Sequence, residues 1–158
     1  MTAGSPERIA VVTGGGAGIG RAVCELLAAT GLHVIVADRD PGASEDAVAA
    51  IRGSSESARV DVTDTASVEA LMRDLGARFA ELHALVNCAG VARPAPSHEL
   101  TDEDFIDLLG IHLHGTLRCC RAGSQCSHLA LPQYSIVASM KRRWIIVTTK
   151  MTRASTDA

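Results

Sequence analysis

Short, continuous apolar runs divide the first part of the chain at regular intervals. Runs of this kind are typical of strands that are buried on both faces of a parallel sheet. Four strands are therefore predicted, at Arg8–Thr13, His33–Ala37, Ala58–Val62 and Leu82–Val86. The third run is the weakest of the four, and the second is followed directly by an acidic residue, Asp38.

Between these runs, apolar residues recur every three or four positions, which predicts amphipathic helices. An alanine-rich second helix is expected at Ala43–Ile51, and Gly31 is well placed to cap the first helix at its C-terminus. The residues expected to face the core are Ile19, Val23, Leu26 and Leu27 in the first helix and Val68, Leu71, Met72, Leu75 and Phe79 in the third.

A fourth helix is predicted after a loop that contains two prolines. Its expected start, at Thr101–Asp104, reads Thr-Asp-Glu-Asp, which is similar to a capping box. The residues that share one face of this helix are Phe105, Leu108, Leu109, His112, Leu113, Leu117 and Cys120. The pattern predicts one continuous amphipathic helix over residues 105–120.

The alternation of strand and helix predicts an α/β fold of three layers, in which helices cover both faces of a doubly wound parallel sheet. Two further segments, Ser135–Ala138 and Trp144–Thr148, are also strand-like. One of them is expected to add a fifth strand, and Trp144–Thr148 has the better β-forming composition.

Composition agrees with a single globular domain of 158 residues, with 47% apolar residues and a net charge of −3. No apolar run approaches the roughly 20 residues of a membrane span, and no secretory leader is visible, so a cytoplasmic protein without membrane contact is expected. The overall acidity does not indicate nucleic-acid binding. Five irregularly spaced cysteines do not indicate a disulfide framework.

Charge divides the chain into two parts. Residues 1–122 contain 10 Arg, no Lys and 17 acidic residues, whereas residues 123–158 contain 3 Arg, 2 Lys and one Asp. Residues 1–122 are therefore predicted to form a domain of uniform character. Residues 123–158 are predicted to be an atypical basic tail that either belongs to this domain or is poorly ordered.

The segment VVTGGGAGIG, residues 11–20, joins the first predicted strand to the first predicted helix. Glycines at this place let the backbone approach a pyrophosphate, and the helix N-terminus offers free N–H groups. Asp38 can accept hydrogen bonds from an adenosine ribose and would repel a 2′-phosphate. This favours NAD over NADP, although the neighbouring Arg39 weakens the preference. A glycine-rich turn without a ligand is the alternative.

Four motifs in order resemble those of the short-chain dehydrogenase/reductase family. Thr13–Gly20 matches its TGxxxGIG loop, and Asp61-Val62 matches the pair that contacts adenine. Asn87–Gly90 matches its NNAG motif with Cys88 in place of the second Asn, and Ile111–Thr116 resembles VNLxGT. Without a ligand, Asp61 would be a turn or cap residue and Asn87 a link between strands.

The resemblance implies that residues 1–122 form a Rossmann-type domain that binds NAD and, in the family, transfers hydride between alcohols and ketones. The cofactor-binding residues assigned in this way are Thr13, Gly14, Gly16, Gly18, Ile19, Gly20, Asp38, Arg39, Asp61, Val62, Asn87, Ala89 and Gly90. The apolar helix over residues 105–120 resembles the one through which family members associate, so a homo-oligomer is a further expectation.

Carbonyl reduction needs a proton donor whose pKa is lowered toward neutrality by a nearby cation. The family supplies this pair as Tyr-x-x-x-Lys. The chain has one tyrosine, Tyr134, and alanine stands four positions later, at Ala138. Its two lysines, Lys141 and Lys150, do not have the required spacing from this tyrosine.

Counting at the family's spacing leads to the same result. His112 takes the place of the helix Asn, Ser139 that of the Ser, and Thr152 and Thr156 those of the Tyr and Lys. Threonine is too weak an acid to replace the tyrosine, and His112 is expected to be a half-buried member of its helix face. The fold is therefore expected to be C-terminally incomplete, by divergence, truncation or a frameshift that the gene sequence would reveal.

Two function hypotheses remain open. One is an NAD-dependent oxidoreductase for alcohols and ketones, impaired by the missing pair; the other is a catalytically inactive dinucleotide-binding module. A metal site is not predicted, because the His and Cys residues of residues 112–128 lack ligand spacing. The basic run Lys141–Arg143 is read as solvated surface.

Overall fold

The structure is a computed structural model that describes residues 8–125, 134–138 and 146–150. Its elements in chain order are β1 (Ile9–Thr13), α1 (Gly18–Ala29), β2 (His33–Asp38), α2 (Pro41–Ala50), β3 (Ser55–Arg59), α3 (Thr65–Arg78), β4 (Leu82–Asn87), α4 (Asp102–Leu109), the π-helical segment η1 (Gly110–Gly115), α5 (Thr116–Gln125), β5 (Tyr134–Ala138) and β6 (Ile146–Lys150). Among these described elements, no helix is long and apolar enough to cross a membrane.

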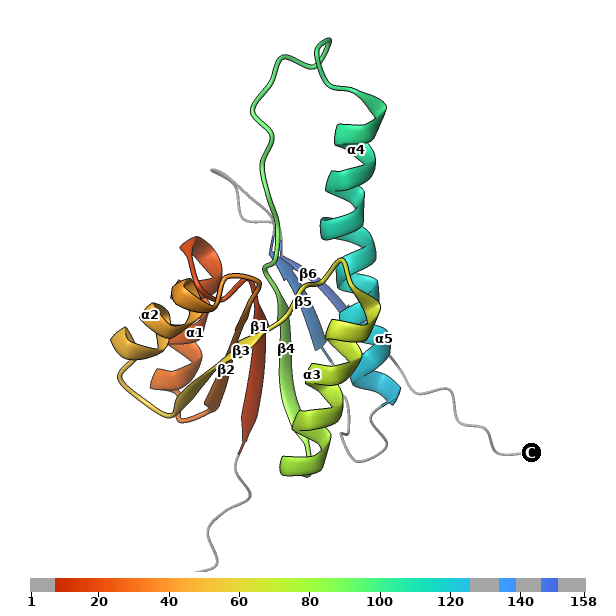
Figure 1. Cartoon of the computed structure of the whole chain (residues 1–158). Coiled ribbons are helices and arrows are strands. Elements are labelled where there is room, and N and C mark those ends of the chain that lie inside the picture. Colours follow the sequence, from red (N-terminus) through yellow and green to blue (C-terminus); the bar gives the residue numbers. More distant parts are fainter. Residues whose placement is uncertain (1–7, 126–133, 139–145, 151–158) are drawn as a thin grey trace, which may run out of the picture.

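The strands form one sheet in the order β3-β2-β1-β4-β5-β6 (Figure 1). All neighbouring pairs are parallel except β5 and β6, which are antiparallel. The expectation of a single fifth strand was wrong, because β5 and β6 both belong to the sheet. Residues 144–145 of the second predicted segment lie outside the described residues. The chain runs outward from β1 to β3 and then returns to place β4 on the other side of β1. This reversal creates a switch point between β1 and β4, where α/β proteins bind ligands.

Helices cover both faces of the sheet, as the three-layer expectation requires (Figure 1). Alternate residues of each central strand point to opposite faces. Ile9 and Val11 pack with α3 and α5, whereas Ala10 and Val12 pack with α1 and α2. The strands therefore have apolar residues on both faces, which explains their continuous apolar runs.

The third strand lies three residues earlier than predicted, at Ser55–Arg59 rather than Ala58–Val62. Among the described strands it pairs with β2 alone, at an edge of the sheet, and its residues are half-exposed or exposed. An edge strand does not need a continuous apolar run. The apolar residues Val60 and Val62 follow the strand and are buried in the core that α3 covers.

The predicted stripe of α1 is confirmed in part, because Val23 and Leu27 are half-buried and pack against the core, but small residues make the fully buried contact with the sheet. Gly20, Cys24 and Ala28 are the buried positions of α1, whereas Leu26 is 66% exposed. Small side chains let the helix backbone lie close to the strands. The predicted cap was correct, since Gly31 follows the helix with φ +85°.

The next two helices begin at capped residues. In α2, Asp40 is the N-cap and Pro41 the first helical residue, two residues before the predicted start. In α3, Asp64 is the N-cap, and the predicted stripe is confirmed by burial of Val68, Leu71, Met72 and Leu75.

The predicted helix over residues 105–120 consists of three consecutive segments rather than one. After α4, residues Gly110–Gly115 form a π-helical turn before α5 begins. The large apolar residues do not form the core contact, because Phe105, Leu113 and Leu117 are more than half exposed. Cys119 and Ala122 of α5 pack on the sheet instead. The α4 segment carries no buried residue and projects beyond the sheet (Figure 1).

Candidate functional site

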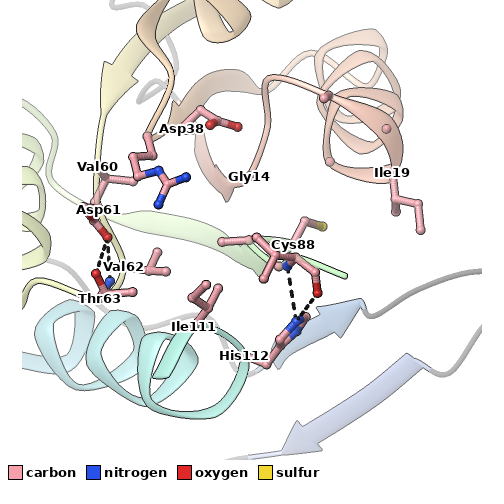
Figure 2. A pocket seen from close by; sticks show the side chains of 17 residues that line it. Gly14, Ile19, Asp38, Val60, Asp61, Val62, Thr63, Cys88, Ile111 and His112 are labelled. Carbon is pink, nitrogen blue, oxygen red and sulfur yellow. Dashed lines mark hydrogen bonds between the residues drawn. The ribbon is translucent and has the colours of Figure 1, made fainter. Parts of the chain in front are cut away.

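A pocket of about 630 Å³ opens at the carboxyl ends of β1, β2 and β4, at the switch point of the sheet. This volume is in the usual range for small-molecule sites. The glycine loop forms one side, the segment after β3 a second, and the loop after β4 with η1 a third (Figure 2). The lining residues are Gly14, Ala17, Gly18, Ile19, Gly20, Asp38, Arg39, Val60, Asp61, Val62, Thr63, Cys88, Ala89, Gly90, Val91, Ile111 and His112.

The glycine loop leaves room for a ligand because side chains are excluded from it. A Cβ on Gly20 would overlap the carbonyl group of Gly14, so the loop turns back on the start of α1 more tightly than any other residue allows. Gly18 begins α1 with φ +55°, and no atom lies within 4 Å of the place of its absent Cβ. The loop therefore presents open backbone at a helix N-terminus, the arrangement that suits a phosphate group.

Asp38 is held at the edge of this loop by two backbone groups. Its Oδ2 accepts a hydrogen bond from the Gly16 N–H at 3.0 Å, and its Oδ1 accepts one from the Asp40 N–H at 3.1 Å. A carboxylate oxygen can accept more than one hydrogen bond. Asp38 therefore keeps acceptor capacity toward the pocket while its orientation is fixed.

Asp61 lies on the wall next to Asp38, because it follows β3 and the Val60 N–H donates to the Asp38 carbonyl at 2.9 Å. The Asp61 Oδ1 accepts hydrogen bonds from the Thr63 hydroxyl at 2.7 Å and from the Thr63 N–H at 2.9 Å (Figure 2). These bonds lower the pKa of the Asp61 carboxyl, and the positive charge of Arg39 lowers it further. Asp61 is thus a carboxylate at neutral pH, and its charge opposes that of Arg39.

The segment Asn87–Gly90 carries the chain from β4 across the base of the pocket. Thr13 of β1 holds this segment in place through two hydrogen bonds. The Thr13 carbonyl accepts from the Cys88 N–H at 3.0 Å, and the Thr13 Oγ1 accepts from the Ala89 N–H at 3.4 Å. A Cβ on Gly14 would lie 2.7 Å from the Ala89 Cα, so the two loops touch at this point. Three predicted site residues, Thr13, Gly16 and Asn87, lie behind the pocket and support its walls.

His112 lines the third side of the pocket. It is half-buried, as predicted, and its ring also bonds to the loop after β4. Its Nε2 lies 2.9 Å from the Val91 carbonyl oxygen and 3.3 Å from the Val91 nitrogen (Figure 2). The ring donates to the carbonyl when Nε2 is protonated and accepts from the N–H when it is not. A Cβ on Gly90 would lie 2.5 Å from the His112 Cε1, so glycine is required beside the ring. The ring thus fixes the loop after β4 against η1.

The thiol in the pocket is not an activated nucleophile. Burial raises the pKa of Cys88 to about 11, and burial together with the nearby Cys88 raises that of Cys24 beneath the glycine loop to about 12. Both side chains are therefore thiols at neutral pH, and the thiolate is the reactive form. In the residues that the structure describes, no group of three or more His, Cys, Asp and Glu side chains is arranged to hold a metal ion.

Several residues that line the pocket were not predicted from the sequence. Val60 and Thr63 flank the predicted pair, and Ile111 precedes His112, so their nearness to the motifs was the available signal. Val91 is brought in by the His112 ring, a contact that no local pattern indicates. Ser139, Thr152 and Thr156, assigned by family spacing, lie outside the described residues.

The fold and the glycine loop at its switch point define a Rossmann-type α/β protein. The model of the family described as short chain dehydrogenase matches residues 8–130. The chain belongs to this family, whose members bind nicotinamide cofactors. The chain has the residues to hold such a group, because the glycine loop gives backbone access and Asp38 and Asp61 offer acceptors at the ends of β2 and β3.

Individual relatives agree with this assignment. Cis-4-hydroxycyclohexanecarboxylate dehydrogenase of Sinomonas cyclohexanicum is 44% identical over 117 residues, which cover 72% of this chain and 47% of that protein. D-threitol dehydrogenase of Mycolicibacterium smegmatis is 37% identical over 118 residues, 73% of this chain and 45% of its own. Actinorhodin polyketide ketoreductase, solved with NADPH, superposes with a TM-score of 0.71 at 27% identity, covering 76% of this chain and 47% of that one. The chain spans about half the length of the curated relatives it matches.

Proposed function

We propose that residues 1–122 form a cofactor domain that binds NAD(H) in preference to NADP(H). The observation that carries this proposal is the Asp38 carboxylate, oriented beside the glycine loop by the N–H groups of Gly16 and Asp40. Bound there, the adenosine ribose would donate its hydroxyl hydrogens to Asp38, and a 2′-phosphate would meet a negative charge. The positive charge of Arg39 also interacts with the Asp61 carboxylate. This interaction reduces the attraction that Arg39 would exert on a 2′-phosphate.

The preference is tested by removing the charge of Asp38. In Asp38→Asn, the affinity for NADPH relative to NADH should rise about tenfold or more, because the repulsion of the 2′-phosphate is lost. Both affinities are measured by titration of the cofactor's fluorescence. Asp46→Asn, an exposed carboxylate of α2, is the matched control and should leave the ratio unchanged. An unchanged ratio in Asp38→Asn would contradict the proposed preference.

We propose further that the chemistry belongs to the oxidoreductase class, with hydride moved between an alcohol or ketone and the nicotinamide. The nicotinamide cofactor supplies the hydride chemistry. The chain's own residues bind it at the glycine loop, orient its ribose through Asp38 and hold the loop after β4 through His112. Both curated relatives described above are dehydrogenases.

The alternative is a binding module without turnover, and one sequence feature favours it. The 158 residues contain no Tyr-x-x-x-Lys, since Tyr134 is followed by Ala138 four positions later. The two functions separate in one experiment, a titration with NADH followed by an assay with alcohols and ketones. Binding without turnover selects the module, and turnover selects the enzyme. Absence of NADH binding by the folded chain would overturn both.

We also propose that the protein is a homo-oligomer that associates through α4, η1 and α5. Phe105, Ile106, Leu113 and Leu117 are 57–64% exposed along these segments. Several large apolar side chains exposed along consecutive helical segments are typical of an association surface. The partner proposed is a second copy of this chain, in line with the family resemblance of this helix. The cytoplasmic location expected from the sequence stays a prediction.

A further inference from the structure

Arg118 of α5 holds a place that no sequence motif indicates. Its guanidinium donates three hydrogen bonds to neutral oxygens on three different segments. Nη1 donates to the Val62 carbonyl at 3.2 Å and to the Gly110 carbonyl at 3.3 Å, and Nε donates to the Thr65 hydroxyl at 3.2 Å. The side chain is partly buried, so these bonds replace part of its hydration.

The three acceptors belong to the segments that form two neighbouring walls of the pocket. Val62 lies in the segment that carries Asp61, and Thr65 begins α3 directly after that segment. Gly110 begins η1, the segment that carries His112. One side chain therefore ties the wall that follows β3 to the wall formed by η1.

The two walls are also in direct contact at this point. A Cβ on Gly115, at the end of η1, would lie 2.9 Å from the Val62 Cγ2, so the close approach depends on glycine. The Thr116 hydroxyl donates to the His112 carbonyl at 2.8 Å, which fixes the same turn from its other end. A π-helical turn changes the phase of the helix, and its geometry here is held by side-chain donors at both ends.

Arginine is suited to this role in a way that lysine is not. The guanidinium is planar and presents five N–H donors in a rigid fork, so it can bond acceptors on separate segments at once. A lysine ammonium is a single point on a flexible stem. Lysine can keep one or two of these bonds, but it cannot span all three acceptors with the same orientation.

We propose that Arg118 is a positioning residue for the dinucleotide: it fixes the distance between the Asp61 wall and the His112 wall, so that a ligand reaching both walls binds more tightly. This inference rests on the proposed function, because it concerns the same pocket. Arg118 acts through Val62 and Gly110 and does not itself line the pocket. A ligand that reaches only one wall should therefore be affected less than a dinucleotide.

The test compares NADH with AMP, which is only half as long and lacks the nicotinamide end. Calorimetric titrations are made with the wild-type chain, Arg118→Met, Arg118→Lys and the control Arg121→Met. Arg121 is an exposed arginine one turn away on the same helix. Circular dichroism establishes the folded fraction of each variant, and affinities are expressed per folded molecule.

In Arg118→Met, affinity for NADH should fall about tenfold, the size of one lost charge-assisted hydrogen bond, while affinity for AMP falls less than about threefold. Arg118→Lys should show an intermediate NADH loss, and Arg121→Met none. A purely structural role of Arg118 would lower the affinities for NADH and AMP by the same factor, and this result would overturn the inference. If Arg118→Met does not fold, the same comparison is made with Arg118→Lys.

The proposed function and this inference fail in different ways. Wild-type binding of NADH combined with equal NADH affinity in Arg118→Met would overturn only the positioning role of Arg118. A folded wild-type chain that does not bind NADH would overturn the proposed function, and the positioning role with it. Selective loss of NADH affinity supports both.

Discussion

Gly18 and Gly31 adopt the same unusual backbone conformation at opposite ends of α1. Their φ angles are +55° and +85°, and neither has an atom within 4 Å of the place where a Cβ would stand. Only Gly18 lines the pocket. The two positions therefore share a conformational constraint and differ in their access to a ligand.

Alanine substitution at these two glycines separates the constraint from the site. Gly18→Ala and Gly31→Ala should each lower the free energy of unfolding by about 1 kcal/mol, because an L-residue is strained at positive φ. Only Gly18→Ala should also weaken NADH binding, since its methyl group would occupy space at the wall of the proposed binding pocket. Urea unfolding and fluorescence titration give the two quantities. Equal NADH affinities in both variants would show that Gly18 has no role in binding.

At the scale of elements, α3 and α4 begin with similar caps and differ in how they are packed. The N-cap Asp64 accepts a hydrogen bond from the Ala66 N–H, and the N-cap Thr101 forms a full capping box with Asp104. Four residues of α3 are buried, and none of α4 is. Helices with few buried contacts open locally without unfolding the rest of the molecule.

Removing each cap should therefore have different consequences. Asp64→Ala should lower the global free energy of unfolding by about 1 kcal/mol. Thr101→Ala should leave the global value nearly unchanged but raise amide hydrogen exchange in α4 about fivefold, the equivalent of about 1 kcal/mol of local stability. Chemical unfolding and exchange measured by mass spectrometry distinguish them. The same global loss in both variants would mean that α4 is part of the cooperative core.

At the scale of the whole molecule, the exposed apolar residues on α4, η1 and α5 predict association. Leu117→Glu should convert the proposed oligomer to a monomer, because a carboxylate cannot be buried in an apolar contact without a partner. Light scattering after gel filtration measures the mass. Leu26→Glu is the matched control, since Leu26 is 66% exposed on α1, which covers the other face of the sheet. A wild-type monomer, or an equal effect of both substitutions, would contradict the proposed surface.

The order of elements, the doubly wound sheet and the place of the glycine loop could be predicted from the sequence. The reason is that central strands buried on both faces need continuous apolar runs, and a packed helix such as α3 needs a periodic stripe. Capping residues are equally local, so Gly31 and the start of α4 were recognisable. These signals arise from neighbours in the chain.

Only the tertiary structure decided which residues meet across the fold. The displaced β3 reflects its position at an edge, where one neighbouring strand rather than apolar content determines the pairing. The His112–Val91 bond and the three bonds of Arg118 join segments that are far apart in the sequence. The small-residue contact of α1 and the π turn of η1 depend on contacts of this kind. The sequence by itself therefore determined the framework and the place of the glycine loop. The shape and the walls of the pocket were decided by long-range packing, for which no local period exists.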